Sequence, residues 1–320
     1  MIETRLTRAF GLEHPIVSAP MALASGGALA AAVSGAGGLG LIGGGYGDAE
    51  WLETAFRDAG NARVGCGFIT WKLAQQPHLL DAVLAHDPAV LFLSFGDPRP
   101  FGDQIADAAV PLICQVQTIE HLDQAIEAGA KAVVAQGGEA GGHGATRGTL
   151  NFVAEAADHL TRHAPNVLLL AAGGIADGRG LAASLMLGAD GVLIGTRFWA
   201  TQECLAPVPM RQAGIAANGD QTIRSSLPDI ARRLDWPAPF TIRTARNAFT
   251  DTWEGDPEGL RQQDELPAAY AKAFQAGDAD LAPPIVGEAI GLIHDMPKAG
   301  DVVTRIATEA EALLAGAWRR

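Results

Sequence analysis

The sequence predicts an α/β fold, a (β/α)8 TIM barrel with an appended helical cap segment, on the strength of three observations. Short apolar runs bounded by glycine or proline recur eight times in the first two-thirds of the 320-residue chain. A segment of helical periodicity follows each run, so strand and helix alternate at intervals of roughly 20–35 residues. The runs are continuously apolar, which is typical of parallel strands buried on both faces. Eight units favour a closed barrel over an open doubly wound sheet, which usually has fewer strands.

Each predicted strand is a short run with little alternation between apolar and polar residues. In chain order the runs are PIVSAPM from Pro15, GLGLIGG from Gly38, RVGCGFIT from Arg63, AVLFLSFG from Ala89, PLICQVQ from Pro111, AVVAQGG from Ala132, VLLLAAGG from Val167 and GVLIGTRF from Gly191. The segments between them, such as GALAAAVSGAG and TIEHLDQAIEAGA, are rich in alanine and have helical spacing. Each run and its helix therefore form one predicted strand–helix unit.

The pattern changes after Phe198, which divides the chain into three predicted parts. We expect the barrel to occupy residues 1–204. Residues 205–280 are richer in charge, proline and tryptophan, with helical stretches and no strand signal, so they predict a helical cap or insertion. Residues 281–320 become apolar and helical again, which indicates a C-terminal segment that packs back on the barrel.

Composition and charge limit the class of partner. The net charge is −13 and lysine and arginine form no cluster, which excludes a nucleic-acid surface and favours small-molecule ligands. Cys66, Cys114 and Cys204 are too few and too scattered for a disulfide framework. The N-terminal stretch lacks the apolar core of a leader, and no window reaches the length of a membrane span. We therefore expect a cytoplasmic protein without membrane partners, and the sequence does not indicate its oligomeric state.

The ends of the seventh and eighth predicted strands have the pattern of a phosphate site. Barrel enzymes bind ligands at the carboxyl ends of their strands and often hold a phosphate in these two loops. Gly173 and Gly174 leave backbone N–H groups open where ADGRGLAASL begins a helix, and a helix N-terminus favours an anion. Gly195 and Thr196 offer a second turn and a hydroxyl donor. Either motif alone is equally well explained as a tight turn, but the two together predict a phosphate.

The stretch GGEAGGHGATRG, residues 137–148, sets His143 among six glycines. Glycine is retained where the backbone adopts positive φ or comes very close to another group, so we expect a ligand against this loop. Imidazole can accept a proton near neutral pH. An isolated loop histidine is more often a surface residue, and the setting of His143 favours a catalytic role. Gln115 and Gln136 lie in apolar strands, where a buried amide needs either a protein partner or a ligand.

Five motifs occur in order along nearly the whole chain: APM at Ala19–Met21, AVSGAGGLGLIGGG at Ala32–Gly45, QGGEAGGHGA at Gln136–Ala145, AAGGIADGRG at Ala171–Gly180 and GTRF at Gly195–Phe198. Together with the closing GEAIGLIHDMP, they resemble the nitronate monooxygenase family, formerly called 2-nitropropane dioxygenases. The combination is similar to a superfamily of FMN-dependent barrels that also holds flavin-dependent enoyl-ACP reductases and some NADH:quinone reductases. The resemblance is therefore more specific for the superfamily than for one reaction.

The resemblance implies FMN as the cofactor, with its phosphate in the two glycine turns where strand order already predicts an anion. It places Met21 under the isoalloxazine ring, and Gln115 and Gln136 on the ring or the ribityl chain. The implied cofactor-binding residues are Ala19, Met21, Gly67, Gln115, Gln136, Gly141, Gly142, Gly173, Gly174, Gly195 and Thr196. His143 is the implied catalytic residue, and nothing in the sequence indicates a metal site.

The function that follows is FMN-dependent oxidation of an alkyl nitronate by O2, which yields an aldehyde or ketone plus nitrite. His143 is needed chiefly for neutral nitroalkanes, because their α-proton must be removed first. One alternative is an NAD(P)H-dependent FMN reductase of the enoyl-ACP or quinone reductase type, and another is a flavin-binding protein without turnover. The sequence leaves two placements open for Trp71, in GCGFITWKL: it points inward and occupies the space of a nicotinamide, or it is a core or surface aromatic.

Overall fold

Eight parallel strands form the barrel in the computed structural model, which describes residues 2–318. Neighbouring strands follow the order β1-β9-β8-β6-β5-β4-β3-β2, and a parallel bridge between Val17 and Leu39 joins β1 to β2. Their bounds are β1 (Ile16–Ser18), β2 (Gly40–Gly45), β3 (Val64–Ile69), β4 (Leu91–Ser94), β5 (Leu112–Val116), β6 (Ala132–Gln136), β8 (Leu168–Ala172) and β9 (Gly191–Ile194). The predicted barrel is confirmed, and each of its strands falls within one predicted apolar run, except that β2 extends one residue further, to Gly45.

The strands are apolar throughout because both faces of the sheet are buried. Along β4, Phe92 points to the cluster inside the barrel, while Leu91 and Leu93 belong to the cluster between the barrel and its helices. The same alternation places Val133 outside and Val134 inside on β6. A strand with two buried faces has no place for the alternating polar residues of a half-exposed strand.

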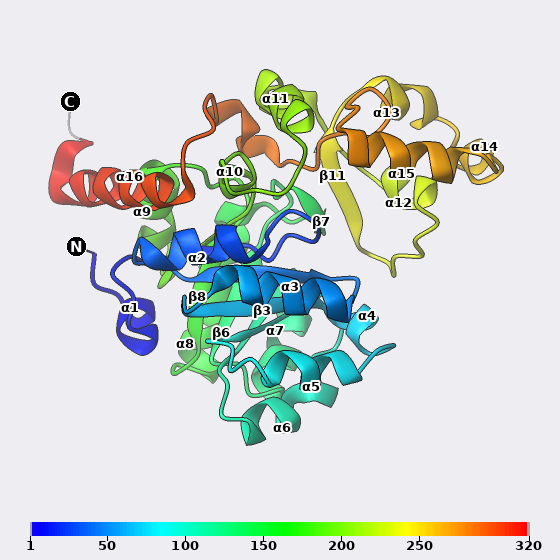
Figure 1. Ribbon diagram of the computed structural model, residues 1–320. Helices are drawn as coiled ribbons and strands as arrows, with labels where there is room; N and C mark the ends of the chain where they lie inside the picture. Colours follow the sequence, from blue (N-terminus) through cyan, green and yellow to red (C-terminus); the bar gives the residue numbers. More distant parts are fainter. Residues whose placement is uncertain (1, 319–320) are drawn as a thin grey trace.

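Helices cover the outside of the barrel, as Figure 1 shows. Short polar side chains begin several of them: the Asp48 side chain accepts from the Trp51 N–H, and that of Thr118 from the His121 N–H. The helices of this part are α1 (Arg5–Phe10), α2 (Gly27–Gly35), α3 (Ala49–Ala59), α4 (Thr70–Leu73), α5 (His78–Leu84), α6 (Arg99–Asp107), α7 (Ile119–Glu127), α8 (Thr149–His163), α9 (Gly178–Met186) and α10 (Thr196–Trp199).

Residues 205–280 lie beside the barrel and contain strands as well as helices, so the expectation of a cap without strands is wrong. In this segment β10 (Thr222–Ser225) and β11 (Thr241–Ala245) pair antiparallel, and β11 also pairs with β7 (Gly142–Gly144) from the loop after β6. Both cap strands are short and carry arginines, and their third partner lies about a hundred residues away in the chain, so no local pattern reveals them. The helical elements are α11 (Val208–Ala216), η1 (Gly219–Gln221), α12 (Leu227–Ala231), α13 (Ala248–Trp253), α14 (Pro257–Arg261) and α15 (Leu266–Ala276).

The C-terminal segment contains η2 (Glu288–Leu292), α16 (Ala299–Ala312) and η3 (Leu313–Ala317). Helix α16 lies along α9 and α2 (Figure 1) and buries Val302, Val303 and Ile306 there. The domain limits at residues 204 and 280 stay a prediction. Among residues 2–318, no helix has both the length and the apolar character needed to cross a membrane.

Candidate active site

One cavity lies at the carboxyl ends of the barrel strands, between the barrel and the cap. Its lining includes residues from the ends of β1, β3, β5, β6, β8 and β9, together with residues of the cap. It brings together every site residue predicted from the sequence: Ala19, Met21, Gly67, Gln115, Gln136, Gly141, Gly142, His143, Gly173, Gly174, Gly195 and Thr196. Strand order therefore placed these residues around one space, as a barrel requires.

The two glycine turns line the cavity after β8 and β9, and we call this part of the cavity the anion end because of its open N–H groups. Gly173 and Gly174 follow β8 with φ of 104° and 75°, a region that favours glycine. Among the described residues, the backbone N–H groups of Gly174 and Thr196 donate to no protein acceptor. The Thr196 hydroxyl accepts from the Gly287 N–H at 3.0 Å, which leaves its own proton free to donate. Open N–H groups beside a hydroxyl suit an anion such as a phosphate.

The prediction that the N-terminus of the helix after Gly174 attracts the anion is wrong. The N-terminus of α9 is already occupied by carboxylates: Asp177 accepts from the N–H groups of Arg179 and Gly180, and Glu309 accepts from the Gly178 N–H at 2.8 Å. These bonds use the donors that a helix N-terminus would offer to an anion. The open donors belong to the turn that precedes the helix.

The two strand glutamines differ in their partners. The Gln136 side chain is engaged within the protein, since its Oε1 accepts from Gln117 Nε2 at 2.9 Å and its Nε2 donates to the His143 carbonyl at 3.1 Å. Gln115 Nε2 is buried and has no hydrogen-bond partner. A buried amide without a partner in a cavity wall is costly unless a ligand accepts from it.

The end of β1 lies against the turn after β9. A Cβ built on Gly195 would be 3.6 Å from Ala19 Cβ and 3.8 Å from Met21 Sδ, which places all three residues at one point of the cavity wall. On the neighbouring side, a side chain at Gly67 would collide with the Pro20 ring. Gly67 therefore lets the Pro20 ring pack closely against β3, and Gly195 brings Ala19 and Met21 close to the turn after β9.

His143 lines the cavity from β7, where it pairs with Ile242 of β11, and we call this part of the cavity the histidine end. Its Nε2 is 3.0 and 2.9 Å from the two carboxylate oxygens of Asp229. Its ring stacks on Trp236, with 3.3 Å between centroids and 10° between planes. Burial lowers the pKa of His143, and the adjacent Asp229 carboxylate opposes that shift. The imidazole is therefore neutral near pH 7 and able to accept a proton.

Asp229, Arg232 and Trp236 belong to the site but were not predicted from the sequence. Arg232 Nη2 donates to Asp229 Oδ1 at 2.6 Å, so one carboxylate serves both a histidine and an arginine. The stretch LPDIARRLDWPAP offers one weak signal, an aspartate and an arginine three residues apart on a short helix. Nothing in that spacing indicates a partner 86 residues earlier in the chain.

Of the two placements that the sequence leaves open for Trp71, the structure shows the one outside the cavity. Trp71 is not among the lining residues, and its ring packs edge-on against Trp236 at 5.5 Å between centroids. Trp236 itself lines the cavity, and its Nε1 donates to the Tyr46 hydroxyl at 3.1 Å. The aromatic wall near His143 therefore comes from Trp236 of the cap and from Phe95, which follows β4, while Trp71 lies behind Trp236.

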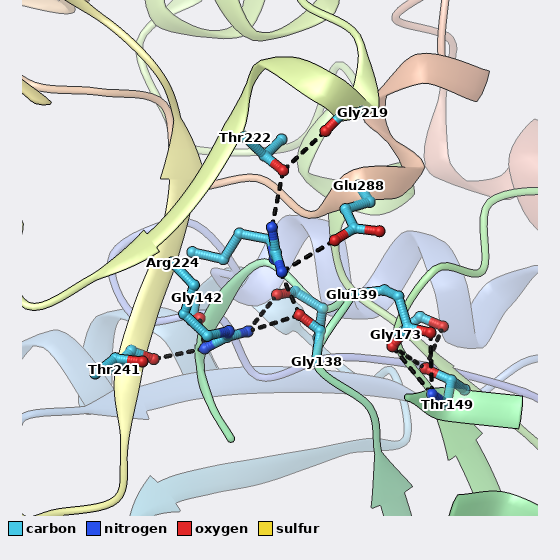
Figure 2. Close-up of polar contacts among 12 residues, drawn as sticks. Gly138, Glu139, Gly142, Thr149, Gly173, Gly219, Thr222, Arg224, Thr241 and Glu288 are labelled. Carbon is cyan, nitrogen blue, oxygen red and sulfur yellow. Dashed lines mark hydrogen bonds and ion pairs between the residues drawn. The ribbon is translucent and has the colours of Figure 1, made fainter. Parts of the chain in front are cut away.

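Two arginines of the cap sheet hold the glycine-rich loop (Figure 2). Arg224 donates to the carbonyls of Gly138 at 3.1 Å and Ala140 at 2.9 Å, and Arg243 Nε donates to Gly138 at 2.9 Å. Burial, and then the nearby Arg243, lower the pKa of Arg224 to about 10. Arg243 also forms an ion pair with Glu288 at 3.0 Å. The loop carbonyls therefore point to guanidinium groups, which fixes the backbone that carries His143.

Much of the glycine content of this loop is explained by contacts within the chain. A side chain at Gly141 would collide with the backbone of Val286 and Gly287. Glu139 turns back to the start of α8, where it accepts from the Thr149 N–H at 3.0 Å and the Thr149 hydroxyl at 2.7 Å. Gly141 is thus required by the C-terminal segment, whether or not a ligand lies on its other side.

Comparisons with known proteins agree with this architecture. A family model described as nitronate monooxygenase matches residues 3–64 and 68–309. The chain is 32% identical to a nitronate monooxygenase of Neurospora crassa over 92% of this chain and 89% of the relative. It is also 32% identical to the nitronate monooxygenase npaC of Metarhizium robertsii over 93% of this chain and 91% of the relative.

Two solved structures are similar over nearly the whole chain. FabK from Thermotoga maritima has a TM-score of 0.85 at 27% identity and covers 99% of both chains. A nitroalkane oxidase from Streptomyces ansochromogenes has a TM-score of 0.79 at 28% identity and covers 97% of this chain and 99% of its own. The family match and the curated relatives favour a nitronate monooxygenase over the two alternatives weighed from the sequence, a pyridine-nucleotide-dependent reductase and a flavin-binding protein without turnover. The chain belongs to the nitronate monooxygenase family of flavin-dependent oxidoreductases.

Proposed function

We propose that this protein uses FMN and O2 to oxidise small alkyl nitronates to a carbonyl compound and nitrite, and that it also accepts neutral nitroalkanes. The observation that carries the proposal is that open N–H donors and a buried histidine–aspartate pair meet in one cavity. Such a site can hold a phosphate-bearing cofactor and place a base beside its reactive part.

The residues of the cavity fit FMN. The Gly174 and Thr196 N–H groups and the Thr196 hydroxyl would hold the phosphate, because they are donors without another demand on their protons. The unpartnered Nε2 of Gln115 would donate to a polar atom of the ring or the ribityl chain. Met21 and Ala19, beside Gly195, would form the wall under the ring. When bound, FMN supplies the electron transfer from the nitronate to oxygen, and the protein supplies placement and polarity.

His143 would act before the electron transfer and only on neutral substrates. A nitroalkane carries an acidic proton on the carbon next to nitrogen, and a neutral imidazole near that carbon can accept it. A nitronate has already lost this proton and has no need of the base. The aromatic walls formed by Phe95 and Trp236 exclude water from this end of the cavity and suit a compact apolar substrate.

The cofactor is tested directly by heat release from the purified protein. We expect FMN in about a 1:1 ratio to the chain, because the cavity at the rim of the barrel has one set of anion donors and can hold one phosphate. Recovery of FAD, or failure to take up FMN on reconstitution, would overturn the proposed cofactor.

The reaction is tested by anaerobic mixing of the flavin-loaded protein with a short-chain nitronate, NADH or NADPH. We expect the nitronate to bleach the flavin fastest, followed by nitrite and carbonyl product when oxygen is admitted. Rapid stoichiometric bleaching by either pyridine nucleotide would assign the protein to the reductase alternative.

We also propose a cytoplasmic location. Cys66, Cys114 and Cys204 are free and buried, which suits a reducing compartment. Fractionation of the source cells with an antibody to the protein checks this location, and recovery outside the cytoplasm would contradict it.

A further inference from the structure

We propose that Asp229 is a positioning residue for His143: it holds the imidazole as the tautomer with hydrogen on Nε2, so that Nδ1 is the atom that accepts the substrate proton. The inference rests on the proposed function for the identity of the substrate. Its statement about the tautomer depends only on the protein.

The hydrogen-bond geometry sets the tautomer. Both carboxylate oxygens of Asp229 lie within 3.0 Å of Nε2, and an ionised carboxylate only accepts hydrogen bonds. Nε2 must therefore carry the hydrogen, and Nδ1 carries the lone pair. Among residues 2–318, Nδ1 has no hydrogen-bond partner, and His143 lines the cavity. The free nitrogen is thus the one available to a substrate.

The ring cannot easily turn to exchange its nitrogens. One face stacks on Trp236, and Phe95 meets the ring edge-on at 6.1 Å between centroids. Trp236 is itself fixed by its hydrogen bond to Tyr46. The backbone of His143 is held in the cap sheet by pairing with Ile242. Orientation of the imidazole is therefore a property of the cap and the loop together.

The charged groups around the His143 ring allow it to accept a proton from a neutral substrate. Asp229 favours the imidazolium, whereas Arg232, which follows α12, and Arg224 on β10 disfavour it. Asp229 and Arg232 balance each other while His143 is neutral. When the C–H bond of a nitroalkane breaks, its electron pair stays on the substrate as the nitronate anion and the proton goes to Nδ1. The new imidazolium and the new anion then balance each other.

The tautomer is measured on the wild-type protein by two-bond ¹H–¹⁵N correlation with ¹⁵N-labelled histidine. The His143 signals are identified by their loss in His143→Gln. We expect Nε2 to have the shift of a protonated nitrogen and Nδ1 that of a bare one at pH 7. The opposite assignment would overturn the inference, and since no turnover is involved, it would leave the proposed function untouched.

Substitutions of Asp229 and Arg232 distinguish an electrostatic effect on His143 from a general effect on the stability of the fold. Asp229→Asn removes the charge that favours the imidazolium, so the titration midpoint of His143 should fall. Arg232→Gln removes a charge that disfavours it, so the midpoint should rise. Shifts in the same direction would mean that the two residues only support the fold.

Kinetics gives a second measure of the same pair. Asp229→Asn should lower the turnover of a neutral nitroalkane by roughly 10²-fold while its nitronate turnover changes far less, because only the first substrate needs the base. Asp229→Glu, which keeps the carboxylate, should recover part of the loss. Equal losses on both substrates would contradict a role in proton transfer. If Asp229→Asn does not fold, the wild-type tautomer still decides the proposal.

Discussion

The two ends of the cavity are built in different ways. The anion end consists of two short turns, Gly173–Gly174 after β8 and Gly195–Thr196 after β9, and both belong to the barrel. The histidine end is assembled from β7, α12 and the loop that carries Trp236, and its central contact joins residues 86 positions apart. The difference teaches that the barrel provides a place for the cofactor, while the cap sets the chemistry beside it.

The two ends also differ in their energetics. The anion end offers backbone donors and almost no side chain, so its geometry follows from the turns alone. The histidine end buries Asp229 and partly buries Arg224 and Arg232, whose desolvation is costly unless they are paired and hydrogen-bonded. We therefore expect changes at the anion end to alter cofactor content, and changes at the histidine end to alter turnover with the cofactor in place.

The largest effect is expected for His143→Gln at the histidine end. Turnover of a neutral nitroalkane should fall by about 10²–10⁴-fold, because general-base catalysis contributes that much, while nitronate turnover and flavin content are largely kept. The measurement compares kcat/KM for the two substrate forms. His78→Gln, on the exposed side of α5, is the matched control. Equal loss on both forms would mean that His143 positions substrate or flavin.

The pH dependence of the wild type sharpens the same prediction. Burial lowers the pKa of His143 below the usual histidine value of about 6.5. The imidazole therefore stays neutral, and able to act as a base, down to this lowered pKa. Nitroalkane turnover should be full above this pKa and fall as the pH drops through it. A fall that begins clearly above pH 6.5 would contradict the assignment.

At the anion end, Gly174→Asp should weaken FMN binding by about 10²-fold or more. It adds a side chain at φ 75° and a carboxylate where the phosphate would lie, and both changes cost free energy. Flavin titration of the apoprotein measures the loss. Gly129→Asp is the matched control, since Gly129 has φ 79° with open space around it and lies away from the cavity. Equal flavin affinity in both variants would break the comparison between the two ends.

A smaller effect is expected for Arg224→Met in the cap sheet. The loop carbonyls of Gly138 and Ala140 lose donors, so the free energy of unfolding should fall by about 2 kcal/mol. Urea unfolding measures the change. Arg246→Met is the control, because Arg246 forms only exposed ion pairs, worth about 0–1 kcal/mol. If both variants lose the same stability, the arginine contacts do not hold the loop.

The smallest effect concerns the aromatic wall. NADH and NADPH should reduce the wild-type flavin more slowly than a nitronate does, and Trp236→Leu should narrow this difference by about tenfold or less, because it opens space over the reacting face. Stopped-flow reduction under anaerobic conditions gives the rates. Trp253→Leu, on α13, tests for a general effect of losing a tryptophan. If the ratio of the two reduction rates is unchanged in Trp236→Leu, the Trp236 ring does not limit access of the nicotinamide to the flavin.

Sequence patterns predicted the features whose causes are local. The eight barrel strands were readable because burial on both faces leaves a continuous apolar run, as in VLLLAA before Gly173. The glycine turns were readable because a barrel puts all strand ends on one rim, so strand order alone brings Gly174 close to Thr196. The role of His143 was inferred from its glycine-rich setting, although contacts within the chain account for Gly141.

Only the tertiary structure decided the surroundings of His143. The pairing of β7 with β11, the carboxylate of Asp229 and the stacked ring of Trp236 all depend on how the cap folds over the barrel. A short polar strand or an isolated aspartate has no local pattern that names its partner, because the partner is chosen by packing between distant segments. The sequence by itself therefore determined the barrel and the position of the glycine turns on its rim, whose geometry is repeated and local. The cap determined which groups face the base, since buried charges must find partners wherever the fold brings them together.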